Sequence, residues 1–158
     1  MQPLAVNGSP HKDGRLAIML AKLEVPTAHL SDGIEGAYQA ILKSDPVVFA
    51  TPVMWFNMSA LMKELLERIP ESEEDFPCYD KTAYFFAMCD EDGAQQTIGL
   101  MMSATNHMGF SIPRHASYIY NNKMADKSEN LWQLKAIDEL KNRLVDSNYT
   151  TRPSLLEK

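Results

Sequence analysis

Apolar residues in this chain fall into two kinds of pattern, short continuous runs and longer stretches with helical spacing. Five runs are bounded by turn-forming or polar residues and are expected to be strands: 4–6, 27–30, 47–50, 83–88 and 117–120. The runs at 47–50 and 83–88 show no polar alternation. That pattern is typical of strands buried on both faces in a parallel sheet.

Between these runs, apolar residues recur at intervals of three and four, which predicts amphipathic helices. The expected helices cover residues 14–23, 34–42, 58–69, 93–108 and 130–145. The third has the most regular spacing, with Asn57 available as its N-cap, and both Asn57 and Ser59 are interpreted as helix caps. Strands that alternate with helices predict a parallel sheet with right-handed crossovers. We therefore expect an α/β fold, a doubly wound five-stranded sheet in a three-layer α/β/α sandwich.

The organisation along the chain points to one domain. Residues 1–149 are expected to form it, followed by a tail at 150–158, because the sequence contains no internal repeat, low-complexity tract or long linker. The acidic run at 71–75 is interpreted as a solvated loop. A chain of 158 residues is long enough to bury a sizeable core in this way.

Charge and composition narrow the possible partners. The chain has 15 basic and 21 acidic residues, for a net charge of −6, which argues against a nucleic-acid or anionic-membrane surface. The longest apolar tract, 47–56, is interrupted by Thr51 and Pro52 and falls short of the ~20 residues of a membrane span. The two cysteines have no metal-site spacing. With no secretory signal pattern at its start, the protein is expected to be cytoplasmic.

Ligands in an open α/β sheet bind beyond the carboxyl ends of the strands, which directs attention to three loops. In the first, residues 7–15, two glycines would let backbone amides approach a ligand, and several side chains could donate hydrogen bonds to an anion: Ser9, His11, Lys12 and Arg15. The alternative interpretation is a plain strand-to-helix turn. The loop has neither a P-loop ending nor a GxGxxG pattern.

The other two loops also have unusual composition. Trp55 and Phe56 follow a buried strand, where a turn would favour small polar residues, so they could line a flat aromatic ligand. For Phe56, packing under the next helix is an equally good interpretation. The third loop carries the carboxylates of 90–92 and then Gly93, and is interpreted as a solvated turn or as favourable charge at a helix start. Cys89 is expected to be a small buried residue rather than a nucleophile.

Together, the first two loops resemble a known family. The segment 6–14, Val-Asn-Gly-Ser-Pro-His-Lys-Asp-Gly, is similar to the opening of the NAD(P)H-dependent FMN reductases and multimeric flavodoxins. Residues 45–63, with Phe-Ala-Thr-Pro-Val-Met-Trp-Phe-Asn-Met-Ser-Ala at 49–60, resemble that family's second flavin loop and the helix after it. The resemblance covers about the first two-fifths of the chain closely.

This resemblance implies a flavodoxin-like fold that binds FMN without a covalent bond. It assigns the phosphate to Ser9, His11 and Arg15. The isoalloxazine ring would be bordered by Pro52, Val53, Met54, Trp55, Phe56 and Asn57, with Asp90 and Gly93 flanking its other side. The family transfers hydride from NAD(P)H to FMN and then electrons to a quinone, free flavin or another small acceptor. No catalytic protein residue and no metal ligand is assigned, because the flavin carries the chemistry.

The resemblance also implies a homodimer or homotetramer, and the chain departs from it in three places. Relatives usually have Arg where His11 stands and a hydroxyl residue where Leu16 stands, and Arg15 could compensate as a phosphate ligand. The stretch 23–33 is too short for the cysteine-bearing segment of iron–sulfur flavoproteins. Acidic residues at 90–92 would lower the flavin's reduction potential if they faced the ring. Two other hypotheses stay open, a flavodoxin-type electron carrier without nicotinamide activity and a scaffold without flavin.

Overall fold

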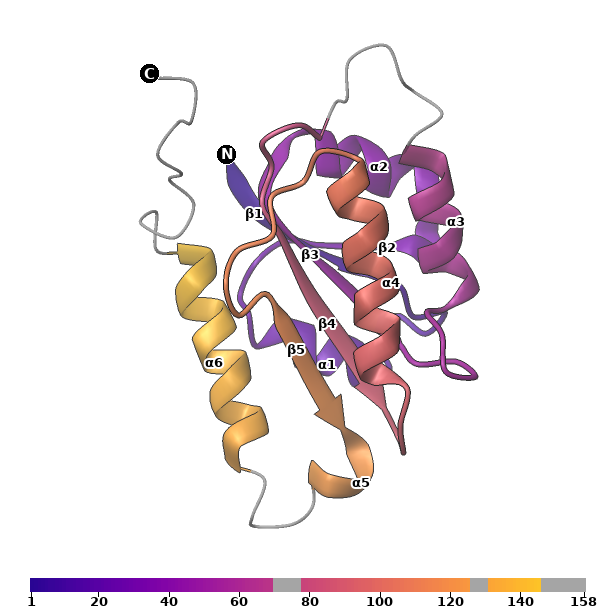
Figure 1. The fold of residues 1–158 in the computed structure, drawn as a ribbon, viewed down its shortest axis with the longest axis vertical. Helices are drawn as coiled ribbons and strands as arrows, with labels where there is room; N and C mark the ends of the chain where they lie inside the picture. The colour runs from indigo at the N-terminus through magenta and orange to yellow at the C-terminus, as the bar shows by residue number, and fades with distance from the viewer. Residues whose placement is uncertain (70–77, 126–130, 146–158) are drawn as a thin grey trace.

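A computed structural model describes residues 1–69, 78–125 and 131–145, and in it a five-stranded parallel sheet forms the middle layer (Figure 1). The strand order is β2-β1-β3-β4-β5. This order matches the doubly wound flavodoxin-like arrangement and confirms the predicted fold class. The strands are β1 (Gln2–Asn7), β2 (Thr27–His29), β3 (Ser44–Pro52), β4 (Ala83–Cys89) and β5 (Ser117–Asn121).

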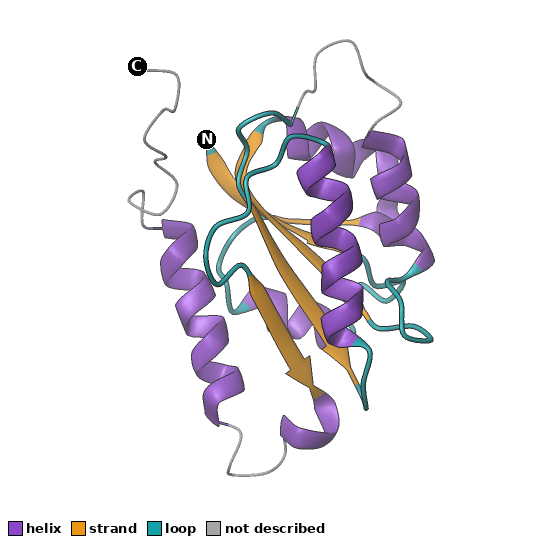
Figure 2. Ribbon diagram, viewed as in Figure 1, coloured by secondary structure: helices purple, strands orange, loops and turns teal. Residues whose placement is uncertain are grey.

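Helices cover both faces of the sheet (Figure 2). They are α1 (Arg15–Ala21), the 3-10 helix η1 (Leu30–Asp32), α2 (Ile34–Leu42), α3 (Ala60–Arg68), α4 (Ala94–His107), α5 (Asn122–Ala125) and α6 (Leu131–Val145). Helix α3 contacts both α2 and α4, so these three form one layer. Right-handed crossovers place α1 on the opposite face. Helix α6 lies near α1, because Lys141 pairs with Glu24 at 2.6 Å.

The centre of the core is the pair of strands β3 and β4. Every residue of β4 is buried, as the absence of polar alternation in its sequence predicts. Phe49 of β3 stacks on Phe85 of β4 with ring centroids 6.0 Å apart, and it forms a T-shaped pair with Phe110 with ring centroids 5.4 Å apart. Aromatic pairs of this kind stabilise beyond the area that they bury. The rigid centre fixes where the loops at the carboxyl ends of β1, β3 and β4 emerge.

Of the two residues interpreted as caps of α3, Ser59 is confirmed and Asn57 was wrong. The helix begins at Ala60, and its cap is Ser59, whose Oγ accepts a hydrogen bond from the Met62 N–H at 3.1 Å. Met58 is buried, at 8% exposed, although it precedes the helix. Apolar spacing therefore placed the predicted start of the helix two residues too early. Asn57 lies instead in a small hairpin described below.

All five predicted strands and all five predicted helices are present within the described residues. Two short elements were not predicted. These are η1 and α5, each a single turn at the carboxyl end of a strand. They are too short for periodicity to reveal. The acidic run at 71–75 and the tail at 150–158 lie outside the described residues.

Candidate functional site

The candidate site lies at the carboxyl edge of the sheet, where the strand order reverses between β1 and β3. Neighbouring strands there are in register, with Asn7 beside Ala50 and Pro52 beside Met88. The three loops that follow β1, β3 and β4 consequently leave the sheet next to one another. Direct contacts then join each loop to the other two.

The first loop is held by hydrogen bonds to its own side chains. The Ser9 N–H donates to Asn7 Oδ1 at 2.9 Å, and the His11 N–H donates to Ser9 Oγ at 3.1 Å. The Gly8 N–H donates to the Ala50 carbonyl at 2.7 Å, and Ser59 Oγ donates to the Gly8 carbonyl at 2.6 Å. The last two bonds tie this loop to β3 and to the start of α3.

Donors remain available in the first loop. Gly14 occupies the N-cap of α1 and provides no side-chain cap. Within the described residues, the N–H groups of residues 15–17 donate to no protein acceptor. Ser9 is buried, at 5% exposed, and its hydroxyl proton likewise has no protein acceptor among those residues. Such a set of unpaired donors suits an anion with several oxygens.

Leu16 explains one departure from the family pattern. Its side chain is 2% exposed and belongs to the core beneath α1. A residue that points into the core contributes packing energy rather than a hydrogen bond. Arg15 and His11 are exposed, so the polar side chains of this loop flank the free amides from the solvent side.

The second loop is a hairpin with an unusual tip. Met54 N–H donates to the Asn57 carbonyl at 2.8 Å, and Asn57 N–H donates back to the Met54 carbonyl at 3.1 Å. The two residues between them, Trp55 and Phe56, have φ of 49° and 61°. Turns with two left-handed residues normally contain Asn-Gly, and a bulky residue there costs about 1–2 kcal/mol.

Packing does not account for the aromatic residues at this tip. Trp55 is 95% exposed and Phe56 is 55% exposed, so the hypothesis that Phe56 packs under the next helix holds at most in part. Strained backbone that displays exposed aromatic side chains is found at ligand-binding sites more readily than at plain turns.

The third loop presses against this hairpin. Gly93 has φ of 89°, and a Cβ on it would lie 2.9 Å from Phe56 Cα and 3.1 Å from Val53 Cγ1. Gln96 Nε2 also donates to the Phe56 carbonyl at 3.3 Å. Only glycine allows this close approach, which fixes the hairpin relative to α4.

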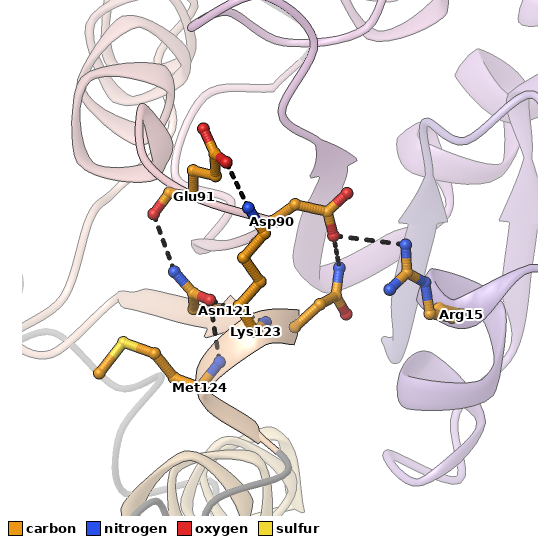
Figure 3. Close-up of polar contacts among 7 residues, drawn as sticks. Arg15, Asp90, Glu91, Asn121, Lys123 and Met124 are labelled. Carbon is orange, nitrogen blue, oxygen red and sulfur yellow. Dashed lines mark hydrogen bonds and ion pairs between the residues drawn. The ribbon is translucent and has the colours of Figure 1, made fainter.

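A fourth loop, which sequence reasoning missed, joins the site (Figure 3). Asp90 Oδ1 accepts hydrogen bonds from Arg15 Nη2 at 3.3 Å and from Asn122 Nδ2 at 2.6 Å. Asn121 Nδ2 donates to the Glu91 carbonyl at 2.8 Å, and Lys123 pairs with the Glu91 carboxylate. Residues 121 and 122 directly follow a predicted strand at the same sheet edge, and that position was the signal available in the sequence.

These ion pairs change the expected electrostatics of the acidic loop. Asp90 and Glu91 each have a cationic partner, so the carboxylates do not act as three free charges. The Arg15 and Asp90 side chains are 66% and 60% exposed, and an exposed pair of this kind contributes little stability and is readily exchanged. Cys89 is buried, as predicted, and burial first, then Asp92 and Asp90, raise the pKa of its thiol.

Residues 1–69, 78–125 and 131–145 contain no group of three His, Cys, Asp or Glu side chains placed to hold a metal ion. None of the helices in these ranges is long and apolar enough to cross a membrane. The structure brings together the predicted loops of Ser9, His11 and Arg15, of 52–57, and of Asp90 and Gly93. The assignment of these residues to particular parts of a cofactor stays a prediction.

Comparisons with known proteins agree with this geometry. The family model described as NADPH-dependent FMN reductase matches residues 13–124. A curated relative, 8-demethyl-8-aminoriboflavin-5'-phosphate synthase of Streptomyces davaonensis, is 27% identical over 85 residues, which are 50% of this chain and 33% of the relative. The chain therefore spans about a third of the length of that relative.

Three solved structures share the fold. RosB with bound 8-demethyl-8-formylriboflavin-5'-phosphate has a TM-score of 0.71 at 17% identity and covers 96% of this chain and 82% of its own. The apo NADH:FMN oxidoreductase EMOB has a TM-score of 0.68 at 20% identity, with 98% of both chains covered. General stress protein 14 of Treponema denticola, in complex with FMN, has a TM-score of 0.68 at 10% identity and covers 91% and 99%.

Proposed function

Because the chain belongs to the NADPH-dependent FMN reductase family, we propose that it binds FMN at the carboxyl edge of the sheet and acts as a flavin-dependent oxidoreductase. Electrons would pass from NAD(P)H through the bound flavin to a quinone, free flavin or another small acceptor. The observation that carries this proposal is the pairing of two features on one edge. The unpaired donors in the first loop suit the oxygens of a phosphate. The strained hairpin with its exposed aromatic side chains suits a flat ring.

The described residues fit FMN at both ends. The free amides of 15–17 and the Ser9 hydroxyl would bind the phosphate, and Arg15 would exchange its weak contact with Asp90 for a charge-assisted bond to a phosphate oxygen. The hairpin, held against Gly93, would position the ring, with Trp55 available beside it. When bound, FMN supplies the hydride-accepting centre. The chain's own residues would bind and orient the cofactor, and none is assigned as an acid or base.

The direct test is cofactor binding followed by reduction. The purified protein should quench FMN fluorescence at micromolar concentration. Under anaerobic conditions, NADH or NADPH should then bleach the visible flavin band within seconds. Bleaching by dithionite alone would make the protein an electron carrier instead. Absence of quenching would refute flavin binding altogether.

The variant Arg15→Ala distinguishes binding of the FMN phosphate from binding of the FMN ring. If Arg15 binds the phosphate, the variant should lose roughly 10- to 100-fold in affinity for FMN, the range for hydrogen bonds to charged groups, and little for riboflavin. Lys12→Ala is the matched control, because Lys12 pairs with Asp32 beside the same loop. Equal losses for FMN and riboflavin in Arg15→Ala would contradict the assignment.

Three further expectations belong to this proposal. The protein should form a homodimer or homotetramer, which sedimentation velocity would test. Its physiological acceptor should be a small molecule rather than nucleic acid or a membrane. A cytoplasmic location, which fractionation would test, stays a prediction.

A further inference from the structure

The carboxyl end of β2 lies beside the first loop. His29 is the last residue of β2 and is in register with Asn7, the last residue of β1. Asn7 is fully buried and His29 is half-buried. Asn7 Nδ2 lies 3.1 Å from His29 Nδ1, and Asn7 Oδ1 accepts the Ser9 N–H at 2.9 Å. One amide side chain therefore connects the histidine ring to the loop.

The chemistry of these contacts fixes the protonation of His29. The backbone N–H of Ser9 can only donate, so the oxygen of the Asn7 amide must face it. The amide NH₂ then faces His29, and Nδ1 must accept a hydrogen bond. An accepting Nδ1 carries no proton, so the neutral ring holds its proton on Nε2.

We propose that His29 is a positioning residue that controls the first loop through Asn7, according to its own protonation. A proton on Nδ1 would place its N–H against the NH₂ of Asn7. Both groups are donors, so no hydrogen bond can form between them. The contact must then separate, or the amide must rotate and turn its oxygen toward the ring. Rotation removes the acceptor from the Ser9 N–H. Because Ser9 Oγ in turn accepts from the His11 N–H, the change reaches the exposed part of the loop.

The charged side chains near His29 on the neighbouring elements have partners of their own. Strand β1 contributes no ionisable side chain. Near β2, Lys12 and Asp32 pair with each other. On α2, Glu35 is held by Gln39 and Arg68, which lower the pKa of its carboxyl in that order. Within the described part of the chain, the His29 ring makes one hydrogen bond, to Asn7.

The coupling can be tested in the protein without FMN. At about pH 8, nitrogen NMR should show His29 Nδ1 unprotonated and Nε2 protonated, and on acidification the Ser9 amide signal should move together with the Nδ1 signal of His29. In His29→Asn, whose Oδ1 stands where Nδ1 stood and always accepts, the Ser9 signal should no longer follow pH. A proton on Nδ1 at pH 8, or a Ser9 signal that moves equally in both proteins, would overturn the proposal.

The consequence for ligand binding rests on the proposed function. At about pH 8, His29→Ala should weaken FMN binding about fivefold, the value of one net hydrogen bond, and His29→Asn should restore it to within about twofold. Once acidification has placed a proton on His29 Nδ1, as its nitrogen signals report, wild type should have lost about fivefold more affinity than His29→Asn. Acid also protonates the phosphate of FMN, because the second pKa of such phosphate esters is about 6. This effect is the same for wild type and His29→Asn, so comparing the two proteins removes it.

The two parts of the experiment fail separately. Wild type that does not bind FMN at pH 8 would refute the proposed function and leave the NMR result to decide the coupling. Parallel pH profiles in wild type and His29→Asn would overturn the positioning role, even if FMN binds tightly. Loss of binding in His29→Ala without rescue by His29→Asn would also overturn it, because a merely structural role for the ring would give that result.

Discussion

Replacing Gly93 with alanine would place a methyl group in the contact between the third loop and the aromatic hairpin. The new Cβ would lie 2.9 Å from Phe56 Cα, 3.1 Å from Phe56 Cδ1 and 3.1 Å from Val53 Cγ1. Two of these neighbours are side-chain atoms that could shift, but the nearest belongs to the backbone of a closed hairpin. The residue also has φ of 89°, which an alanine adopts only with strain.

The two costs can be added for an estimate. A non-glycine residue in left-handed backbone costs about 1–2 kcal/mol, and overpacking a tight contact costs about 1–3 kcal/mol. The free energy of unfolding should therefore fall by roughly 2–5 kcal/mol. With a urea m-value of about 2 kcal/mol/M, the midpoint would fall by at least about 1 M. If the hairpin yields instead, the cost is smaller and FMN binding should weaken, because the hairpin moves.

The measurement is urea unfolding together with FMN titration, with Gly99→Ala as the matched control. Gly99 lies in the same helix, α4, and a Cβ there meets nothing within 4 Å. Alanine at an exposed helix interior should stabilise the protein by about 0.5–1 kcal/mol. Gly93→Ala with both the stability and the FMN affinity of wild type would refute the close-contact reasoning.

Three other perturbations test separate parts of the structure. Trp55→Asn should raise the free energy of unfolding by about 0.5–1 kcal/mol, since asparagine suits left-handed backbone, and should weaken FMN binding. The control is Tyr79→Asn, at another exposed aromatic residue, which should leave FMN binding unchanged. Asp90→Asn should strengthen FMN binding a few-fold by releasing Arg15, and an unchanged titration would contradict that exchange. Burial raises the pKa of Cys78 from 9.0 to about 11, so the folded state keeps a proton that the unfolded state loses. Stability should therefore fall as pH rises from about 9 to 11, and Cys78→Ala should flatten that slope.

The sequence alone determined the architecture. Continuous apolar runs such as 83–88 can only be buried on both faces, and helical spacing between them supplies the covering layers. Strict alternation then requires a parallel sheet, so the carboxyl ends of the strands gather on one edge. That rule places the loops of Ser9, Trp55 and Asp90 on the same edge. The sequence could not decide which residue caps α3, because Asn57 and Ser59 are both good N-caps. The hairpin that contains Asn57 decides between them.

Tertiary structure decided what pairs with what inside that edge. The contacts of Arg15 with Asp90, and of His29 with Asn7, join residues 75 and 22 positions apart, and composition says nothing of such distances. Strand order places β2 beside β1, so a histidine that carried no signal in the sequence reaches the first loop. Left-handed backbone at Trp55 is likewise set by closure of the hairpin against Gly93, not by local preference. Periodicity records which side of an element is buried, whereas partners across a sheet edge depend on register and strand order, which only the folded chain fixes.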